Sequence, residues 1–298
     1  MRTAALLLIG SLSLLPVTQS PDPLRDRIRQ ITAGFDGTIA LYARNLDTGR
    51  DVGIDPDARV RTASTIKLPI LCALEALVAE GKARWDERLT IRPEDKVSGS
   101  GVLSEFTDGA TVSLRDAATL MIVVSDNTAT NLILDRISAD TVNDYLDRIG
   151  LPLTRSMRKI RGDGTALKPA EGWSRAGRLP ENERFGIGSS TPREMVQLLA
   201  MLAEGRIVSP AASKDVLDIL ERQQFKTGLG RHAGDLRVAS KSGSLDALRS
   251  DVGIVYTKGG RLAIAMTVDG MPQIDYSPDN EGERLIWRVT DLLIESLR

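Results

Sequence analysis

Hydrophobic and polar positions divide the chain into a helical middle and two ends that contain strands. Residues 22–35 have helical spacing with Asp22 as a candidate cap, and residues 37–50 alternate before a turn at Asp47-Thr48-Gly49. Beyond residue 235 the alternation returns in "LRVASKSGS", "SDVGIVYT" and "RLAIAMTVDG". Residues 282–298 then close the chain as an amphipathic helix.

Two capping boxes mark helix starts in the middle of the chain. They are Ser113-Leu-Arg-Asp116 and Thr191-Pro-Arg-Glu194, and the second has proline at the first helical position. The residues after the first box repeat at helical spacing, so one helix face would be lined by Leu114, Ala117, Ala118 and Met121.

This order of elements predicts an α/β fold with two domains. An antiparallel sheet flanked by terminal helices would be built from residues 21–62 and 206–298, and an all-α domain from residues 63–205 would be inserted between its halves. A site would then form at the seam between the domains. Residues 155–190 have no sustained period and are not assigned to an element.

The first twenty residues are set apart from the fold. Arg2 precedes an apolar run from Ala4 to Leu15, and a cleavage site is expected near Ser20. We interpret residues 1–20 as a signal peptide, with a retained N-terminal anchor as the alternative. Without them the chain has 38 basic and 40 acidic residues, a balance that gives no electrostatic reason to expect binding to nucleic acid or anionic membrane.

The chain has a single cysteine and a single histidine, which limits the metal sites and catalytic bases that it can form. Cys72 and His232 cannot together form a zinc site, and no metal or cofactor is expected. Cys72 lies in the apolar run "LPILCALEALV" and is predicted to be a buried packing residue. His232 lies in the glycine-rich "GLGRHAG" and is predicted to be solvated. A serine nucleophile would therefore use Lys or Glu as its base.

The stretch "STIK" carries a candidate nucleophile. Residues three apart share a helix face, so the Lys67 amine could take a proton from the Ser64 hydroxyl. Backbone N–H groups at a helix N-terminus would face a developing oxyanion there. Pro69 should kink the first turns. The motif alone does not identify Ser64 as a nucleophile, because Ser156-Met-Arg-Lys159 has the same spacing.

Two further triplets favour Ser64. Ser125-Asp126-Asn127 lies between two apolar helical runs, where it could also be a plain helix cap. Lys241-Ser242-Gly243 ends an alternating strand, where it could also be a plain entry into a turn. A second copy of the latter pattern, Lys226-Thr227-Gly228, follows a helix end and is predicted to be loop.

Together the three motifs resemble the serine β-lactamase and penicillin-binding protein superfamily, and class A β-lactamases in particular. The resemblance covers essentially the whole mature chain and implies a β-lactamase-like fold. It implies that Ser64 is the acylated nucleophile and Lys67 its base or proton relay. Ser125 would pass a proton to the leaving nitrogen, and Lys241 would lower the amine pKa and attract the substrate carboxylate.

The same resemblance implies a set of binding residues. Asn127 would bind the acyl-amide side chain, and the N–H groups of Ser64 and Ser244 would form the oxyanion hole. Ser242 and Arg249 would hold the substrate carboxylate, although Arg249 could equally be a solvated hairpin arginine. In addition, Asn131 would brace the long loop.

The loop before the Thr191-Pro192 helix departs from the class A pattern. Those enzymes carry Glu-x-x-x-Asn there, and the glutamate activates the water that hydrolyses the acyl-enzyme. This loop has no such motif, and its glutamates are Glu171, Glu181 and Glu183. In addition, Gly99, Ser100 and Gly101 stand where many relatives place an aromatic residue, and would leave that rim open and flexible.

The resulting prediction is a secreted or periplasmic monomer that hydrolyses β-lactam antibiotics through an acyl-Ser64 intermediate. The alternative is a penicillin-binding, DD-peptidase-like enzyme that acts on D-Ala-D-Ala peptides and deacylates slowly. A third reading is a non-catalytic sensor or cell-wall-binding module on the same fold.

Overall fold

A five-stranded antiparallel sheet joins the two ends of the chain. The computed structural model describes residues 22–298, so the expected signal peptide lies outside the described residues. The strands are β1 (Thr38–Asn45), β2 (Asp51–Ile54), β8 (Val238–Leu245), β9 (Leu248–Thr257) and β10 (Gly260–Asp269). They lie in the order β2-β1-β10-β9-β8, which confirms the predicted sheet built from both ends.

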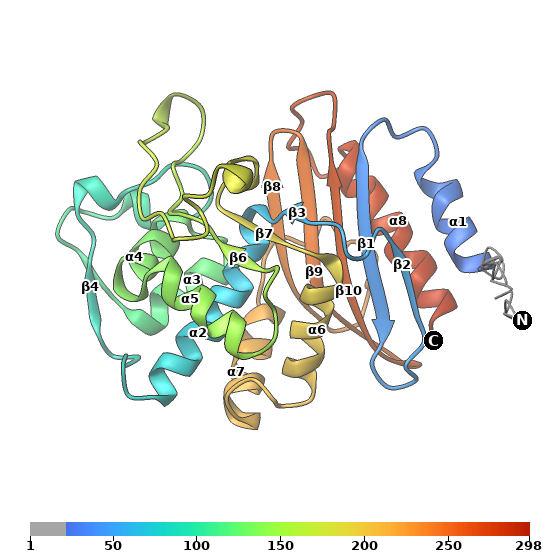
Figure 1. The fold of residues 1–298 in the computed structure, drawn as a ribbon, viewed down its shortest axis with the longest axis horizontal. Coiled ribbons are helices and arrows are strands. Elements are labelled where there is room, and N and C mark those ends of the chain that lie inside the picture. Colours follow the sequence, from blue (N-terminus) through green and yellow to red (C-terminus); the bar gives the residue numbers. More distant parts are fainter. Residues whose placement is uncertain (1–21) are drawn as a thin grey trace, which may run out of the picture.

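The two faces of the sheet pack against two hydrophobic cores. On β10, Ile264 and Met266 join a core with Ile286 of α8 (Glu281–Ser296) and Ile28 of α1 (Pro23–Thr32). The intervening Ala263 and Ala265 join the larger core, which includes α6 (Pro192–Ala203). Successive side chains of a strand point to opposite faces, so β10 alone contributes to both layers. Figure 1 shows α1 and α8 together at the sheet, away from the helical region.

The remaining helices form the other half of the molecule (Figure 1). They are α2 (Lys67–Ala79), α3 (Leu114–Val123), α4 (Asn127–Ile137), α5 (Ala139–Arg148) and α7 (Pro210–Glu221). Apart from Lys67 and Glu75, helix α2 is apolar on all sides, and it lies buried in the larger core. Because α6 lies in the range 63–205 yet packs on the sheet, the domain boundaries at residues 62 and 205 stay a prediction.

The predicted helix starts are confirmed by side-chain caps. The hydroxyl oxygen of Ser113 accepts a bond from Asp116 N at 3.0 Å, and that of Thr191 accepts one from Glu194 N at 3.1 Å. Asp22 caps α1 in the same way. The predicted face of α3 is buried at all four positions: Leu114, Ala117, Ala118 and Met121.

Residues 155–190 are organised by short elements rather than by one long one. These are β6 (Arg155–Ser156), β7 (Gly188–Ser190) and the 3-10 turns η4 (Gly164–Ala166) and η5 (Pro180–Phe185). Strand β7 pairs with both β6 and β3 (Val60–Arg61). The remaining short strands, β4 (Arg88–Thr90) and β5 (Thr111–Ser113), pair with each other, and the remaining turns are η2 (Pro93–Asp95) and η3 (Leu103–Glu105).

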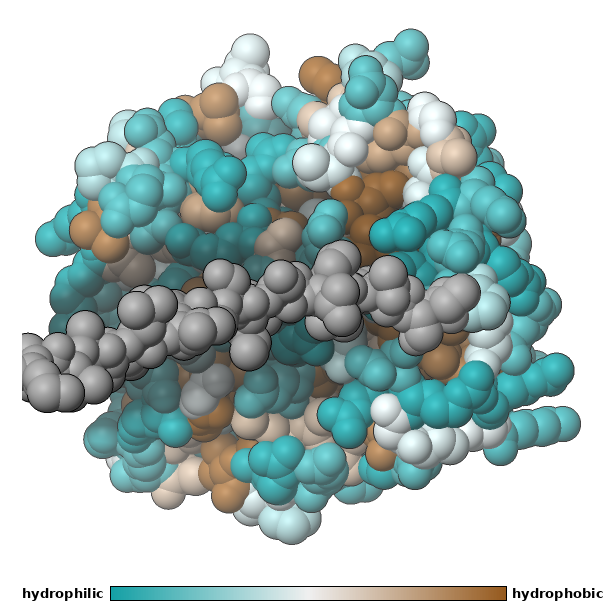
Figure 2. Space-filling model, turned by 45° about the vertical axis from the view of Figure 1, so that its right-hand side comes forward, coloured by the Kyte–Doolittle hydropathy of each residue, from teal (hydrophilic) through white to brown (hydrophobic). Residues whose placement is uncertain are grey.

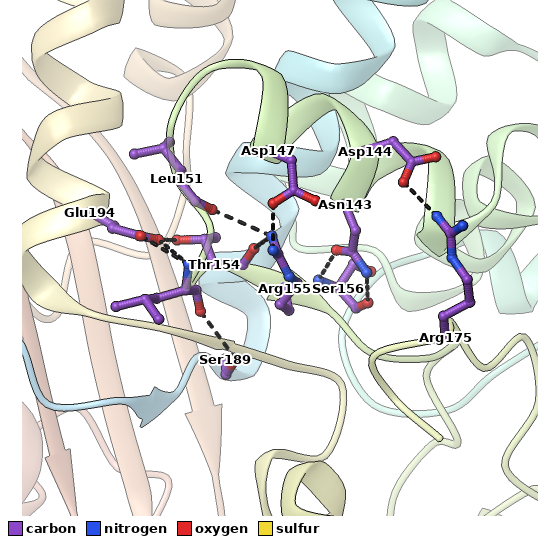
Figure 3. A network of polar contacts seen from close by, with 11 residues as sticks. Asn143, Asp144, Asp147, Leu151, Thr154, Arg155, Ser156, Arg175, Ser189 and Glu194 are labelled. Carbon is purple, nitrogen blue, oxygen red and sulfur yellow. Dashed lines mark hydrogen bonds and ion pairs between the residues drawn. The ribbon is translucent and has the colours of Figure 1, made fainter. Parts of the chain in front are cut away.

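The base of this segment is fastened to two helices, as Figure 3 shows. Thr154 Oγ1 donates to Glu194 Oε2 of α6 at 2.6 Å. Asn143 of α5 donates to Ser156 O at 2.9 Å and accepts from Ser156 N at 2.8 Å. The start of the segment is therefore held by side chains on both sides, even though its own sequence has no period.

The predictions for the two isolated residues are confirmed. Cys72 is fully buried in α2, and burial raises the pKa of its thiol. His232 is about half exposed and bonds to Asp291 at 2.9 Å. Within residues 22–298, no helix has both the length and the apolarity needed to cross a membrane.

Candidate active site

The candidate nucleophile lies on a strained turn at the seam. Ala63, directly before Ser64, has a φ of 46°, and Ser125 has a φ of 54°. Residues other than glycine seldom adopt this left-handed conformation, and such strain is concentrated at functional sites. The two strained residues belong to two of the three predicted motif regions.

Ser64 lies in the 3-10 turn η1 (Ala63–Ile66), which leads directly into α2. The expected kink at Pro69 is instead a change of helix type. Proline has no N–H to donate to the carbonyl four residues earlier, and Lys67 N–H bonds back to Ser64 O in the tighter 3-10 pattern. Ser64 therefore keeps its place at the start of the helical run.

Lys67 is fully buried and faces the Ser125 motif. Its Nζ donates to Ser125 O at 2.6 Å, to Asn127 Oδ1 at 2.9 Å and to Ser125 Oγ at 3.1 Å. Ser64 Oγ is not among these acceptors, so the expected direct contact between Ser64 and Lys67 is absent from the described structure. An ammonium group has three N–H donors, and all three are engaged here.

Lys241 approaches the same hydroxyl from β8. Its Nζ lies 3.1 Å from Ser125 Oγ and 2.7 Å from Ser242 O. Burial lowers the pKa of Lys241 to about 7, although Asp251 behind it acts in the opposite direction. Burial, and then the charge of Lys241, hold the pKa of Lys67 well below its ordinary value. Burial thus favours the neutral amine, the form that a base requires, at both lysines.

The Ser125-Asp126-Asn127 triplet combines a structural and a chemical role. Asp126 caps α4, since its Oδ1 accepts from Ala129 N at 2.8 Å, and its Oδ2 accepts from Val102 N and Leu103 N at 2.6 and 2.9 Å. The alternative that this triplet is a plain helix cap therefore applies to Asp126 alone. Ser125 and Asn127, on either side of it, face the lysines.

Gly99 and Ser100 of "VSGSGVL" are exposed on the cavity wall, as expected for an open rim, and the two glycines also allow close packing. A side-chain carbon at Gly101 would lie 2.3 Å from Asp126 Cγ, and one at Gly99 would lie 2.8 Å from Asn127 Nδ2. In addition, Asn127 N donates to Ser100 O at 2.9 Å. The segment is therefore tied closely to the Ser125 motif.

Gly243 lets the strand edge approach the nucleophile turn. A side-chain carbon at Gly243 would lie 2.8 Å from both Ser64 N and Thr62 O. Any larger residue would separate β8 from η1. A glycine at the third position of the Lys241 motif is therefore required for β8 and η1 to pack closely at the seam.

A cavity of about 820 Å³ opens onto these motifs. The predicted site residues on its wall are Ser64, Ser125, Asn127, Ser242, Ser244 and Arg249. Three exposed apolar side chains, Leu167, Phe225 and Tyr276, also line it. Lys67 and Lys241 are buried behind this wall and reach the cavity through their contacts with Ser125.

Arg249 is not the solvated hairpin arginine that the sequence allowed. It is 1% exposed, and its guanidinium lies over the Tyr276 ring at 4.6 Å. Its N–H groups bond to three backbone carbonyls, those of Leu245, Leu248 and Asp275. It therefore fixes the rim of the cavity while lining it.

The long loop places an apolar residue on the cavity wall. Asn131 donates to Ile160 O at 2.9 Å and accepts from Ile160 N at 2.8 Å, which confirms that Asn131 braces the loop. The Ile160 side chain lines the cavity. Its position was not predicted, because isoleucine in an aperiodic loop carries no signal.

The loop glutamates lie elsewhere. Glu171 is 65% exposed and lies 3.5 Å from Lys159, and Glu181 and Glu183 are exposed in η5. None of the three is on the cavity wall in the described part of the chain. The carboxyl groups that do line it are those of Asp163, Asp246 and Glu283.

The second copies of two motifs, at Ser156–Lys159 and Lys226–Gly228, have different surroundings from the first copies. Ser156 is buried on β6, and Lys159 Nζ bonds to Asp135 at 2.9 Å. The Lys226 triplet follows α7 outside the sheet, as predicted, although Thr227 lines the cavity. Residues 22–298 contain no cluster of three or more His, Cys, Asp or Glu side chains suited to a metal ion.

Known proteins match this chain over most of its length. The model of the family described as "Beta-lactamase enzyme family" matches residues 23–297. The "Beta-lactamase regulatory protein BlaB" of Streptomyces cacaoi is 27% identical over 92% of this chain and 96% of its own length.

Two solved structures share the fold over most of the chain. A β-lactamase from Sphaerobacter thermophilus superposes with a TM-score of 0.78 at 29% identity, over 92% of this chain and 96% of its own. An acyl-enzyme complex of a PBP-A point mutant with penicillin G gives 0.76 at 30% identity, again over 92% and 96%.

Proposed function

Because the chain belongs to the β-lactamase enzyme family, we propose that it is a serine hydrolase that opens the β-lactam amide by forming an acyl-enzyme at Ser64. One observation carries the proposal: the Ser125 hydroxyl lies 3.1 Å from two buried lysines, on a cavity that Ser64 also lines. This arrangement can move a proton between a nucleophile and a leaving nitrogen.

The acylation step follows from these contacts. Ser64 Oγ attacks the lactam carbonyl carbon, and its proton passes to the neutral amine of Lys67. The N–H groups of Ser64 and Ser244 hold the oxyanion. When the C–N bond breaks, Ser125 gives its proton to the nitrogen and regains one from Lys67. Lys67 must exchange one of its present acceptors for Ser64 during this step.

The substrate carboxylate would be held at the β8 end of the cavity. Lys241 contributes a cation and Ser242 a hydroxyl, and Arg249 fixes the neighbouring rim through its bond to Leu245 O. The Asn127 amide would bind the acyl-amide side chain. The substrate class is therefore a small β-lactam, or a D-Ala-D-Ala peptide with the same carboxylate, and no cofactor takes part.

A second candidate function is a penicillin-binding enzyme that deacylates slowly. Ile160 favours it, because this side chain cannot activate water yet lies on the cavity wall. If the carboxyl groups on the cavity wall, those of Asp163, Asp246 and Glu283, do not act as a general base, hydrolysis of the acyl-enzyme would be slower by about 10²–10⁴-fold. Both candidates share the acylation step and differ only in the lifetime of its product.

We further propose that the mature protein is a secreted or periplasmic monomer. Residues 1–20 have the pattern of a signal sequence, and the part of the face in Figure 2 that grey atoms do not cover is mostly hydrophilic, with apolar areas between the hydrophilic ones.

The test combines turnover with intact mass. The wild type should hydrolyse a chromogenic cephalosporin over many turnovers, and Ser64→Ala should not. A single stoichiometric burst with an adduct that persists for hours would favour the slow enzyme instead. If neither drug nor D-Ala-D-Ala peptide acylates Ser64, the non-catalytic reading takes the place of both.

A further inference from the structure

Strand β8 is the edge of the five-stranded sheet, so half of its backbone groups point away from the sheet. Ser242 is one such position. Its N–H donates to Gln223 Oε1 at 2.8 Å, and its carbonyl accepts from Lys241 Nζ at 2.7 Å. By the same alternation the backbone groups of Ser244 also point outward, at the cavity.

The Gln223 side chain completes this edge, and both its oxygen and its nitrogen form hydrogen bonds. It is 1% exposed and lies just beyond the end of α7. Besides Ser242 N, its Oε1 accepts from Ser242 Oγ at 3.1 Å and lies 3.4 Å from Lys241 Nζ. Its Nε2 donates to Ser240 Oγ at 2.9 Å. Because a backbone N–H can only donate, the oxygen of the amide must face Ser242.

The segment that carries Gln223 also contacts the opposite side of the seam. The backbone N–H of Gln224 donates to Val123 O at 2.9 Å, two residues before Ser125. One short segment therefore contacts both β8 and the end of α3. Lys241 also links the two sides of the seam, since its Nζ lies 3.1 Å from Ser125 Oγ.

We propose that Gln223 is a positioning residue for acyl transfer at Ser64, which holds Lys241 and Ser242 in line with Ser125 and with the substrate carboxylate. The proposal rests on the proposed function. A buried amide suits this task because it accepts hydrogen bonds without a charge. A carboxylate at the same place would pair with Lys241 and compete with the carboxylate of the substrate.

The charged groups around Lys241 come from three other elements. Lys67 of α2 lies across Ser125, Asp251 of β9 lies behind the strand, and Glu283 of α8 lies beyond Asp251. Gln223 adds no charge to this set. Exchanging it for glutamate changes the charge beside Lys241 and keeps an oxygen acceptor in place.

The experiment measures the rate of acylation of Ser64 by penicillin from pH 5 to 10 in three variants of the full chain. Gln223→Leu should acylate at least about 10-fold more slowly, since it leaves Ser242 N–H and Lys241 without an acceptor. Gln223→Glu should still be acylated, but more slowly than the wild type because its carboxylate competes with that of penicillin. The alkaline limb of its pH profile should move upward by about one pH unit, because a carboxylate stabilises the cation of Lys241. Gln224→Leu, the same exchange at an exposed neighbour, should match the wild type.

Two results would overturn the inference: acylation by Gln223→Leu within about twofold of the wild type, or a Gln223→Glu profile with an unmoved alkaline limb. If Gln223→Leu does not fold, the profile of Gln223→Glu decides alone. A wild type that is never acylated would instead contradict the proposed function, so the two failures are distinguishable.

Discussion

At the scale of single residues, the site depends on two buried lysines around one hydroxyl. The side-chain nitrogens of Lys67 and Lys241 each lie 3.1 Å from Ser125 Oγ, and both side chains are fully buried. Burying two cations this way is unfavourable for folding. The same burial lowers the pKa of each amine and so makes a base available.

The lowered pKa of Lys67 predicts a pH-dependent stability difference from Lys67→Met. In the unfolded chain Lys67 keeps its ordinary pKa near 10.4, so between its lowered folded pKa and this value the unfolded state binds more protons. The free energy of unfolding of the wild type, relative to Lys67→Met, should therefore rise with pH, by up to about 1.4 kcal/mol per pH unit.

Urea unfolding of both proteins at pH 7.5, 8.5 and 9.5 measures this difference. A difference that is flat or falls with pH would mean that Lys67 is not held neutral by its surroundings. In the same samples, Lys67→Met should acylate about 10²–10⁴-fold more slowly, because the proposed general base is missing.

Sequence alone placed the residues of the three motifs but not their partners. Ser64, Ser125 and Lys241 stand in short patterns with recognisable spacing, so they could be predicted. Gln223 could not, because its role comes from a contact with β8 that no local period encodes. The contact of Lys67 with Ser125 rather than Ser64 was missed for the same reason: side-chain direction depends on tertiary packing.

At the scale of elements, the sequence predicted the long strands and the capped helices, and it missed the shortest strands. The alternation of β8, β9 and β10 and the caps of α3 and α6 were readable because each repeats or begins with a defined signal. Strands β3, β6 and β7 have only two or three residues each, too few to show a period. These strands nevertheless fasten the long loop beside Ser64.

Gly101, before η3, and Gly109, after it, are expected to respond differently to the same substitution by alanine. Gly101 has a φ of 114°, and an added side-chain carbon would meet Asp126 at 2.3 Å, whereas Gly109 has a φ of 81° with open space around it. Gly101→Ala should reduce the free energy of unfolding by more than about 2 kcal/mol and slow acylation, because Asp126 sets the place of Ser125.

The matched control, Gly109→Ala, introduces only the backbone strain and should lower stability by about 1 kcal/mol with normal acylation. Chemical denaturation and penicillin acylation rates of both variants provide the comparison. Equal losses in the two variants would show that close packing at Gly101 does not position the Ser125 motif.

At the scale of the whole molecule, the cavity is a product of the seam between the sheet and the helices. β8 and its Lys241 motif come from one end of the chain, while Ser64 and Ser125 come from the helical middle. The order of helices and strands was enough to predict this seam. It could not predict which residue of the long loop would face the cavity, because that depends on the clamp of Asn131 on Ile160.

Ile160→Glu is predicted to shorten the lifetime of the acyl-enzyme. The Asn131 clamp uses only backbone atoms of Ile160, so the exchange keeps the loop in place and puts a carboxylate on the wall of the cavity. Deacylation should accelerate at least about 10-fold, as expected for an added general base. The decay of the penicillin adduct, followed by intact mass, measures the rate.

Leu167→Glu controls for charge alone. Leu167 belongs to the same loop and lines the same cavity, but its side chain is about half exposed. Its adduct should decay as in the wild type. Equal acceleration in both variants would show that any added carboxylate suffices, and no acceleration in either would remove Ile160 as the cause of slow deacylation.

The central claim is that Ser64 is acylated by a β-lactam, and time-resolved intact mass after adding penicillin tests it most directly. The wild type should gain the mass of one whole drug molecule, because ring opening releases no leaving group, or should consume the drug with a transient adduct. Ser64→Ala should do neither. A wild type that forms no adduct at any time and leaves the drug intact would contradict the account.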